Sequence, residues 1–361
     1  MKKQWATFFD FLRFIVGSAK EIPDSLKEAD WRELYAIAKK QCLVGVLFDG
    51  IKKLPAEHVG MKKELLLQWM AESQMLEKAN VRLNDAAIQV SEWFRKKGFR
   101  TCILKGQGNA LMYPNPYSRT PGDIDIWVEG GDKRVISFVR SISPHEKACY
   151  HHIEFPSYKG VEVEVHYRPS FLLCFWHNRK LQKYYERVKE EQFLHRVMLG
   201  EQGEIAIPTV EFNLIFQLTH IFSHLMNEGI GLRQLLDYYY VLISDDLLLI
   251  RDRVQKELKE LGLWKFAGGI MYIMQEVFGM PASRLIVPPN EKYGKFVLNE
   301  VLEAGNFGRH DARNRFGRSQ LGHNLQRVYR DIRLVRYFPG EALCEPLFRV
   351  WHFFWRMKNK K

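Results

Sequence analysis

The chain has 361 residues, with 54 Lys and Arg against 42 Asp and Glu, and a formal net charge of +12. Hydrophobic residues make up 46% and charged residues 27%, which excludes a disordered, collagen-like or coiled-coil chain. No apolar run reaches the roughly 20 residues that span a bilayer, and Asp10 and Arg13 interrupt the N-terminal apolar stretch, which favours an amphipathic helix over a signal peptide. Five scattered cysteines without a C-x-x-C pair argue against disulfides and a zinc ribbon. We therefore expect a cytoplasmic protein without a transmembrane segment.

Helical periodicity dominates the start of the chain. Asp30 is typical of a helix N-cap, and the apolar run after it predicts a helix over 31–47. Apolar residues then recur at steps of three and four, which predicts a longer helix over 61–94 with one stripe facing a core. Lys96-Lys97-Gly98 ends this pattern. We predict an N-terminal helical segment over 1–97.

Short apolar runs separated by glycine and proline follow, and they predict a small strand-rich core over 98–200. The predicted elements are a strand over 101–104, a short helix over 107–113, a strand over 123–128, a helix over 133–141, and strands over 150–155 and 161–167 joined by a turn over 156–160. Helical patterns return at Val210, which predicts a C-terminal helical domain over 201–361. Strands in the centre and helices on both sides indicate an α+β fold.

The run Gly122-Asp123-Ile124-Asp125-Ile126-Trp127 is the most informative pattern in the chain. Residues two apart in a strand point to the same face, so Asp123 and Asp125 would stand side by side while the isoleucines face a core. Carboxylate oxygens are hard ligands that suit Mg²⁺. The alternative interpretation is the solvated face of an edge strand.

A second polar face follows about forty residues later. Glu162, Glu164 and His166 alternate with valines, so all three share one face of the strand predicted over 161–167. If this strand neighbours the one over 123–128, three carboxylates converge and could hold a pair of metal ions roughly 3.5 to 4 Å apart.

These residues resemble the uncharacterised bacterial branch of the polymerase-beta-like nucleotidyltransferase superfamily, whose members carry a glycine turn after a strand, two acidic residues spaced by one, and a third on a later strand. The matching residues are Leu104-Lys105-Gly106, Arg119, Gly122-Asp123-Ile124-Asp125, Val163-Glu164-Val165-His166, His220, His224, Gly229-Ile230-Gly231-Leu232-Arg233, Asp237 and Arg336-Tyr337-Phe338-Pro339. The resemblance runs from about Trp31 to the C-terminus. It implies a small mixed sheet between N- and C-terminal helical segments.

The resemblance also implies an activity. It implies transfer of a nucleoside monophosphate from an NTP to an acceptor hydroxyl or similar group, with Mg²⁺ or Mn²⁺ as cofactor. Asp123, Asp125 and Glu164 would be the catalytic residues and the metal ligands, and Glu164 would help to deprotonate the acceptor. Glu162 could replace Glu164, but the Glu-x-His match favours Glu164. The acceptor, which could be a small molecule, a protein or an RNA, is not specified.

The phosphate turn departs from the superfamily pattern. Gly-Ser or Gly-Gly is usual there, whereas this chain has Lys105-Gly106-Gln107-Gly108. Gly106 permits close approach of the backbone to a phosphate, and Lys105 supplies a positive charge. Arg119 is the next nucleotide-binding candidate, with an ordinary loop arginine as the alternative. The departure keeps a second hypothesis open, a catalytically degenerate nucleotide- or RNA-binding protein that retains the fold.

Four residues of the helical region are further candidates for the cleft. His220 and His224 are four residues apart, as are Arg233 and Asp237, so each pair shares a helix face. Packing histidines and a local ion pair are the favoured interpretations. The alternative is that they line an acceptor cleft beside the carboxylates, together with Glu162 and His166.

A cluster of metal-ligand residue types lies at His145, Cys149, His151 and His152. Strand alternation predicts that His151 and His152 point to opposite faces. One ion therefore could not bind all four side chains from a regular strand, and we do not expect a structural zinc site here.

Positive charge concentrates late in the chain. An arginine strip lies between 309 and 336, opposed by Asp311 and Asp331, and its members are Arg309, Arg313, Arg315, Arg318, Arg327, Arg330, Arg333 and Arg336. The strip could bind RNA phosphates, an anionic membrane or the NTP, or it could be a solvated face. The aromatic tail over 347–358 could contact a membrane surface. Docking onto the body of the protein is favoured, because an exposed apolar patch is costly.

Overall fold

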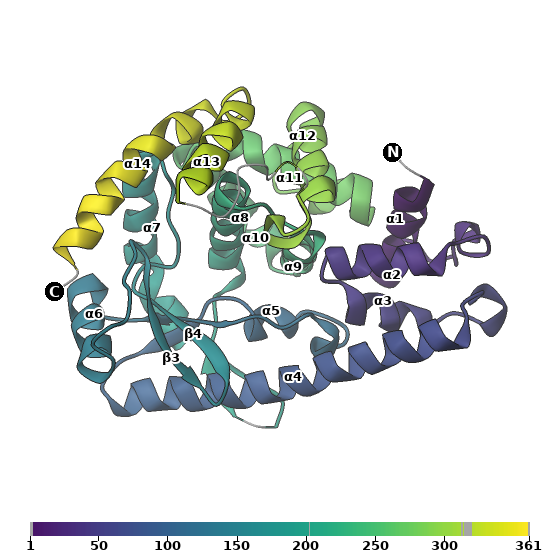
Figure 1. Cartoon of the computed structure of the whole chain (residues 1–361), viewed down its shortest axis with the longest axis horizontal. Helices are drawn as coiled ribbons and strands as arrows, with labels where there is room; N and C mark the ends of the chain where they lie inside the picture. Colours follow the sequence, from purple (N-terminus) through teal and green to yellow (C-terminus); the bar gives the residue numbers. More distant parts are fainter. Residues whose placement is uncertain (1–2, 202, 312, 314–319, 360–361) are drawn as a thin grey trace.

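The computed structural model describes residues 3–201, 203–311, 313 and 320–359 (Figure 1). At its centre lies a mixed four-stranded sheet with the order β1-β2-β4-β3, in which β2 and β4 are parallel and the outer pairs are antiparallel. Its strands are β1 (Thr101–Ile103), β2 (Ile124–Val128), β3 (His152–Tyr158) and β4 (Val161–His166). Helices precede and follow this sheet, so the predicted α+β fold with a small mixed sheet is confirmed.

The N-terminal region is helical and ends in the long helix at the bottom of Figure 1. Its elements are α1 (Lys3–Ile15), η1 (Asp24–Leu26), α2 (Trp31–Lys40), α3 (Val44–Ile51), η2 (Ala56–His58) and α4 (Lys63–Lys96). The side chain of Asp30 accepts hydrogen bonds from the backbone N–H groups of Arg32 and Glu33, which caps α2 where the sequence predicts it. The helix predicted over 61–94 is α4, and it buries an apolar stripe that includes Trp69 and Phe94.

The remaining elements surround the sheet and complete the chain. The central ones are α5 (Gln107–Ala110), η3 (Pro116–Ser118), α6 (Gly131–Ile142), α7 (Phe175–Leu194), β5 (Arg196–Met198) and β6 (Glu204–Ala206). The C-terminal ones are α8 (Val210–Asn227), α9 (Leu232–Leu242), α10 (Leu247–Glu260), α11 (Trp264–Phe278), η4 (Ala282–Arg284), α12 (Glu291–Ala304), η5 (Asn306–Gly308), α13 (Gln320–Leu334) and α14 (Pro339–Lys358). None of the described helices combines the length and hydropathy needed to cross a membrane.

The two faces of the sheet have different partners. Ile124 and Ile126 pack in one hydrophobic cluster with residues of α4 such as Phe94. Trp127 points to the opposite face and stacks on Phe212 of α8, with ring centroids 5.8 Å apart. Asp125 shares the face of Trp127 because side chains alternate along a strand. The carboxylate face is therefore covered by helices of the C-terminal region.

Three predicted elements differ from those observed. The helix expected over 31–47 is broken into α2, which ends at Lys40, and α3, which begins at Val44, because Cys42 between them has a positive φ. The helix expected over 107–113 is the single turn α5, which ends at Ala110, because Tyr113-Pro114 stops it. The turn expected over 156–160 is shorter, because β3 continues to Tyr158 through a register irregularity after Phe155. The reversal then falls at Lys159 and Gly160, which both have positive φ.

The division of the chain over 1–97, 98–200 and 201–361 remains a prediction. One large hydrophobic cluster takes residues from all three ranges, for example Leu47, Leu104 and Leu218. The three regions therefore share a common core.

The C-terminal tail forms α14, and one of its faces packs on the protein. Phe348 contacts Tyr150 and Phe171 with centroid distances of 5.7 and 5.2 Å, and the Nε2 atom of His352 accepts a hydrogen bond from the backbone N–H of Tyr150. The other face leaves large apolar side chains exposed, namely Leu343, Leu347, Val350, Phe353, Phe354 and Met357. The expected docking thus involves only one face of the helix.

Candidate active site

Strand pairing brings together the three carboxylates singled out in the sequence. The parallel register of β2 and β4 sets Asp125 opposite Glu164, and Asp123 directly precedes β2. One oxygen of each of these three side chains lies within 4.8 Å of the others. Glu162 is exposed and belongs to no such group of described residues. Its position on the same strand face does not bring it into the site.

Two cationic side chains contact the central carboxylate. Lys105 Nζ and His166 Nε2 each lie 3.0 Å from Asp125 Oδ1, and His166 Nε2 lies 3.4 Å from Glu164 Oε2. Asp125 is only 2% exposed. A carboxylate this deeply buried requires such partners to remain ionised.

The same contacts set the pKa values of the site. Burial raises the pKa of Asp125, but Lys105 and His166 outweigh it and lower the pKa below its ordinary value. Burial also raises the pKa of Glu164, and the hydrogen bond from His166 lowers it overall. Repulsion from Asp125 raises the pKa of Asp123. Burial lowers the pKa of His166, yet its hydrogen bonds to Asp125 and Glu164 raise it to about 9. His166 is therefore protonated at neutral pH.

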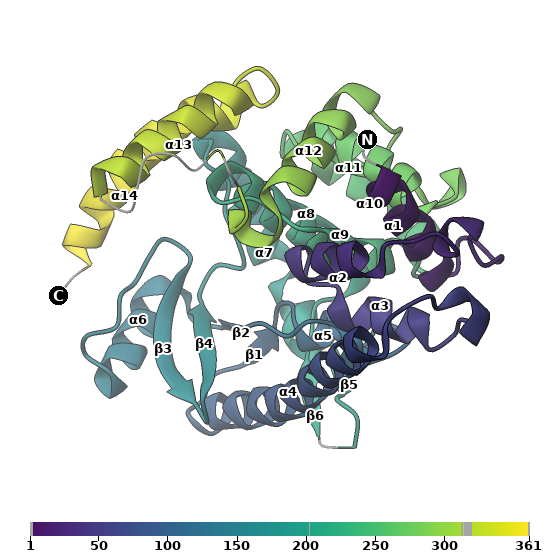
Figure 2. The same ribbon diagram turned by 45° about the vertical axis from the view of Figure 1, so that its right-hand side comes forward.

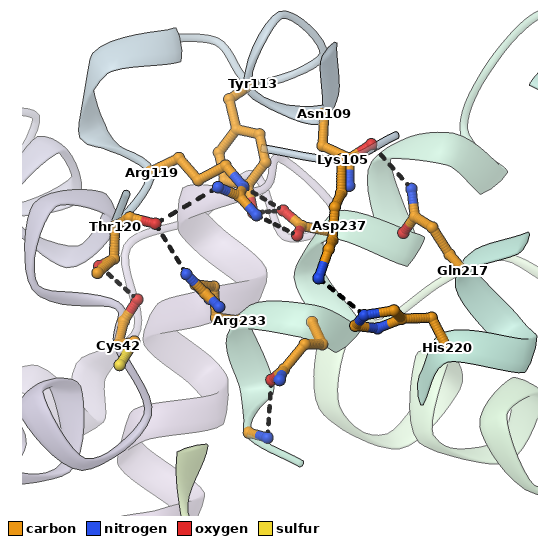
Figure 3. Close-up of polar contacts among 12 residues, drawn as sticks. Cys42, Lys105, Asn109, Tyr113, Arg119, Thr120, Gln217, His220, Arg233 and Asp237 are labelled. Atoms are coloured by element: carbon orange, nitrogen blue, oxygen red, sulfur yellow. Dashed lines mark hydrogen bonds and ion pairs between the residues drawn. The ribbon is translucent and has the colours of Figure 1, made fainter. Parts of the chain in front are cut away.

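Lys105 connects the carboxylates to helix α8. Its Nζ lies 2.8 Å from His220 Nε2 (Figure 3). That ring nitrogen lies 3.2 Å from Nε2 of His224. Burial and the charge of Lys105 hold the pKa of His220 well below its ordinary value, so His220 accepts the hydrogen bond as a neutral ring. Gly106 follows with φ +64°, and a Cβ built there would lie 3.7 Å from the carbonyl oxygen of Asp123. Glycine suits this turn, since other residues disfavour that conformation.

Arg119 and Asp237 form a buried ion pair that the sequence did not predict. The guanidinium donates to both carboxylate oxygens at 2.8 and 2.7 Å, and the Tyr113 hydroxyl donates to the same carboxylate at 2.7 Å (Figure 3). The local ion pair expected between Arg233 and Asp237 is wrong, because Arg233 donates instead to the carbonyl of Thr120. Arg119 is 5% exposed, so it fastens the loop before β2 to α9 and is not free for a phosphate.

A cavity of ≈ 1630 Å³ contains the three carboxylates on its wall together with Lys105, His166, His220 and His224. Helices α13 and α14 lie above β3 and β4 in Figure 2 and contribute to the same wall. Four arginines that line it are Arg309, Arg327, Arg349 and Arg356. His220 and His224 are thus cleft residues as well as packing residues, whereas neither Arg233 nor Asp237 lines the cavity. No local sequence pattern indicated that Arg349 and Arg356 would line this cavity.

Most described members of the arginine strip are engaged within the protein. Arg313 pairs with Glu300 and Asp311, and Arg333 pairs with Glu300. Arg330 is 6% exposed, and its guanidinium donates a hydrogen bond to the backbone carbonyl of Glu228. Two further members, Arg315 and Arg318, lie outside the described residues. A continuous solvated strip for RNA is therefore not formed by the described arginines.

The cysteine and histidine cluster also differs from expectation. β3 begins at His152, so His151 lies before the strand and the alternation assumed for the pair does not apply. Cys149 Sγ lies 3.5 Å from His151 Nδ1 and 3.4 Å from His152 Nδ1. The three side chains meet, and all three line the cavity, whereas the predicted fourth member, His145, is exposed.

The carboxylate group fits a divalent metal. Mg²⁺ and Mn²⁺ prefer oxygen ligands, and carboxylates on neighbouring elements of a cavity wall supply them. Asp123, Asp125 and Glu164 are the residues that would hold such an ion.

Comparison with known proteins identifies the family of the chain. Residues 27–279, more than half of the chain, match the sequence model of a family described as "Uncharacterised nucleotidyltransferase". The chain therefore belongs to this nucleotidyltransferase family. Among solved structures it is similar to an antigenic nucleotidyltransferase-like protein from Paracoccidioides brasiliensis, at 14% identity and a TM-score of 0.28, over 53% of this chain and 91% of that chain. A likeness this weak adds no argument. The search of curated proteins found no match.

The ion pair between Arg119 and Asp237 yields a stability prediction. Asp237→Ala leaves the Arg119 guanidinium buried without its partner, so we expect a loss of about 3 to 5 kcal/mol in the free energy of unfolding. Urea unfolding followed by circular dichroism measures it. Asp24→Ala, which removes the partner of Lys27 in a solvent-exposed pair, is the control and should leave the midpoint unchanged. An equal effect of both substitutions would contradict the structural role of the pair.

The pKa of His166 yields a pH prediction. The pKa of His166 is about 9 in the folded chain, against an ordinary value of 6.5. Protonated His166 therefore contributes its full stabilisation below pH 6.5, and this contribution to the free energy of unfolding is lost as the pH rises through 9. His166→Gln should therefore lower the free energy of unfolding by roughly 2 to 4 kcal/mol more at about pH 6 than at about pH 10. Urea unfolding at both pH values measures the difference. His145→Gln, at an exposed histidine, is the control, and a pH-independent cost of His166→Gln would refute the prediction.

Proposed function

We propose that the chain is a Mg²⁺- or Mn²⁺-dependent enzyme that transfers a nucleoside monophosphate from an NTP to an acceptor hydroxyl. The observation that carries the proposal is the convergence of Asp123, Asp125 and Glu164 within 4.8 Å on the wall of a large cavity. Family membership supports nucleotidyl transfer in general, and the carboxylates support a divalent metal.

In the proposed reaction, the acceptor oxygen forms a bond to the α-phosphorus of the NTP. The bond from that phosphorus to the α–β bridging oxygen breaks, and pyrophosphate leaves with the electron pair. A bound divalent metal would neutralise charge on the triphosphate and favour loss of the acceptor proton. Chemistry of this type depends mainly on positioning and charge neutralisation, and a site built from fixed carboxylates supplies both.

The three carboxylates have different surroundings and therefore different proposed roles. Asp125 is buried and held by Lys105 and His166, which makes it a fixed, ionised metal ligand. The Glu164 side chain is 35% exposed and has a lowered pKa, so it is ionised and accessible from the cavity. We assign to Glu164 the additional task of receiving the acceptor proton, and to Asp123 that of a second metal ligand.

Lys105 directly precedes the glycine of the proposed phosphate turn. Its ammonium is held between Asp125 and His220, at distances of 3.0 and 2.8 Å, beside the place where a metal-bound triphosphate would lie. Nearby carboxylates outweigh burial and raise the pKa of Lys105, so it remains charged. We propose that this charge contacts the triphosphate, with Gly106 allowing the backbone to approach.

The cavity has room for a nucleotide and an acceptor together. At ≈ 1630 Å³ it exceeds the roughly 300 to 1,000 Å³ of a typical small-molecule pocket. His220 and His224 lie on its wall beside Lys105 and are the proposed acceptor-side residues. Arg119 has no role in the proposed reaction.

Metal-dependent NTP binding tests the proposal. Calorimetry should show saturable binding of at least one of the four NTPs by the wild type with Mg²⁺ and none without it. Asp123→Asn/Asp125→Asn should abolish that binding, because the metal loses two ligands. Transfer of label from an α-phosphate-labelled NTP should then fall about 100-fold or more in Glu164→Gln.

Glu162→Gln is the matched control for Glu164→Gln, since both glutamates lie on one face of β4 and only Glu164 belongs to the carboxylate group. It should leave binding and transfer unchanged. Metal-independent binding, or equal effects of the two substitutions, would contradict the proposed site. Binding without any transfer to a mixture of small-molecule, protein and RNA acceptors would favour the catalytically degenerate alternative.

A further inference from the structure

The cluster of Cys149, His151 and His152 lies where the chain reverses tightly before β3. Ala148 and Ile153 pair in antiparallel fashion across this reversal, and the backbone N–H of Cys149 donates to the carbonyl of His152 at 2.9 Å. Only four residues separate the paired positions. Three side chains of metal-ligand type are thereby confined to one small region of the cavity wall.

The spacing of the side-chain atoms matches that of ligands around one metal ion. Sγ of Cys149 lies 3.5 Å from His151 Nδ1 and 3.4 Å from His152 Nδ1, and one ligand atom from each of the three side chains lies within 4.8 Å of the others. A tetrahedral zinc with bonds of about 2.3 Å to sulfur and about 2.0 Å to nitrogen places its ligand atoms roughly 3.3 to 3.6 Å apart. The two sulfur-to-nitrogen distances fall in this range, so one ion can be placed within reach of all three side chains.

The backbone that carries these side chains is held in place by its neighbours. The Tyr167 hydroxyl donates to the carbonyl of Cys149. The carbonyl of His151 accepts from the backbone N–H groups of Tyr167 and Arg168 at 3.0 and 3.1 Å. A site on a fixed backbone binds its ion without first ordering the chain, which favours affinity.

The chemistry of this cluster differs from that of the carboxylate group. A thiolate and two imidazoles favour Zn²⁺ and related transition metals, whereas Asp123, Asp125 and Glu164 offer only oxygen and favour Mg²⁺ or Mn²⁺. The two groups are adjacent, since His152 Nδ1 lies 3.6 Å from Glu164 Oε2. Adjacent sites of different ligand type can hold different ions at the same time.

We propose that Cys149, His151 and His152 form a second metal site that binds Zn²⁺ through one thiolate and two imidazoles. The fourth coordination position of the ion is open and lies on the side of the cavity. Structural zinc sites are closed by four protein ligands, whereas three ligands and an open position are typical of sites that bind water or a substrate atom. The open position faces the cavity that contains the carboxylates.

A second group of described residues has similar ligand types but is a weaker candidate. Cys174, His177 and Glu341 also lie within 4.8 Å of one another. However, Oε2 of Glu341 already accepts from the backbone N–H groups of Leu173 and Cys174, so this carboxylate is engaged with the backbone just before α7. Cys174→Ser is therefore a suitable control for the proposed site.

Zinc stoichiometry tests the proposal. The full chain is stripped with a chelator, incubated with excess Zn²⁺, desalted and measured by inductively coupled plasma mass spectrometry. We expect about one zinc per chain for the wild type and for Cys174→Ser, and loss of that zinc in Cys149→Ser and in His151→Asn. Asp123→Asn/Asp125→Asn should keep the zinc, which separates this site from the proposed nucleotide site. Circular dichroism checks that each variant is folded.

Cobalt substitution identifies the sulfur ligand directly. Co²⁺ bound at the site should give thiolate-to-metal charge-transfer absorption, present in the wild type and in Cys174→Ser and lost in Cys149→Ser. Absence of retained zinc in the folded wild type would overturn the proposal. Retention of zinc and of the charge-transfer band in Cys149→Ser would overturn it equally.

Discussion

The candidate site depends on holding three carboxylates together at a nearly buried position. Like charges at this distance repel, and burial makes their ionisation costlier. The structure offsets both effects by placing Lys105 and His166 against Asp125. Parallel pairing of β2 with β4 supplies the carboxylates, and α8 holds Lys105 through His220. The helical C-terminal region is therefore part of the site, because the neutral ring of His220 on α8 accepts the hydrogen bond that positions Lys105.

Period-two alternation and spacing predicted the part of the site that is local in sequence. The Asp-x-Asp pattern predicted that Asp123 and Asp125 lie together and that the isoleucines face the core. Both assignments hold, with Asp125 and the isoleucines inside β2 and Asp123 directly before it. Alternation in β4 likewise put Glu164 on the matching face. The long amphipathic α4 and the capped α2 were also predictable, since their signals lie within one helix.

The remaining features depend on contacts between distant segments. Nothing near Arg119 indicated that Asp237, 118 residues away, would take its guanidinium, and helical spacing wrongly suggested Arg233 as the partner. The prediction that His151 and His152 point to opposite faces also failed. Side chains alternate between the faces of a sheet only inside a strand, and β3 starts at His152, one residue after His151. The arrangement of α13 and α14 above β3 and β4 likewise results from long-range packing, here of Phe348 on Phe171.

The central claim is that the three carboxylates hold the metal that binds the nucleotide. Its most direct test is a crystal structure of the full chain with Mn²⁺ and an NTP analogue that cannot be cleaved between its α- and β-phosphates, recorded with anomalous scattering from manganese. We expect manganese bound by Asp123, Asp125 and Glu164, with the triphosphate reaching Lys105. Manganese bound elsewhere, or a nucleotide bound away from these carboxylates, would contradict it.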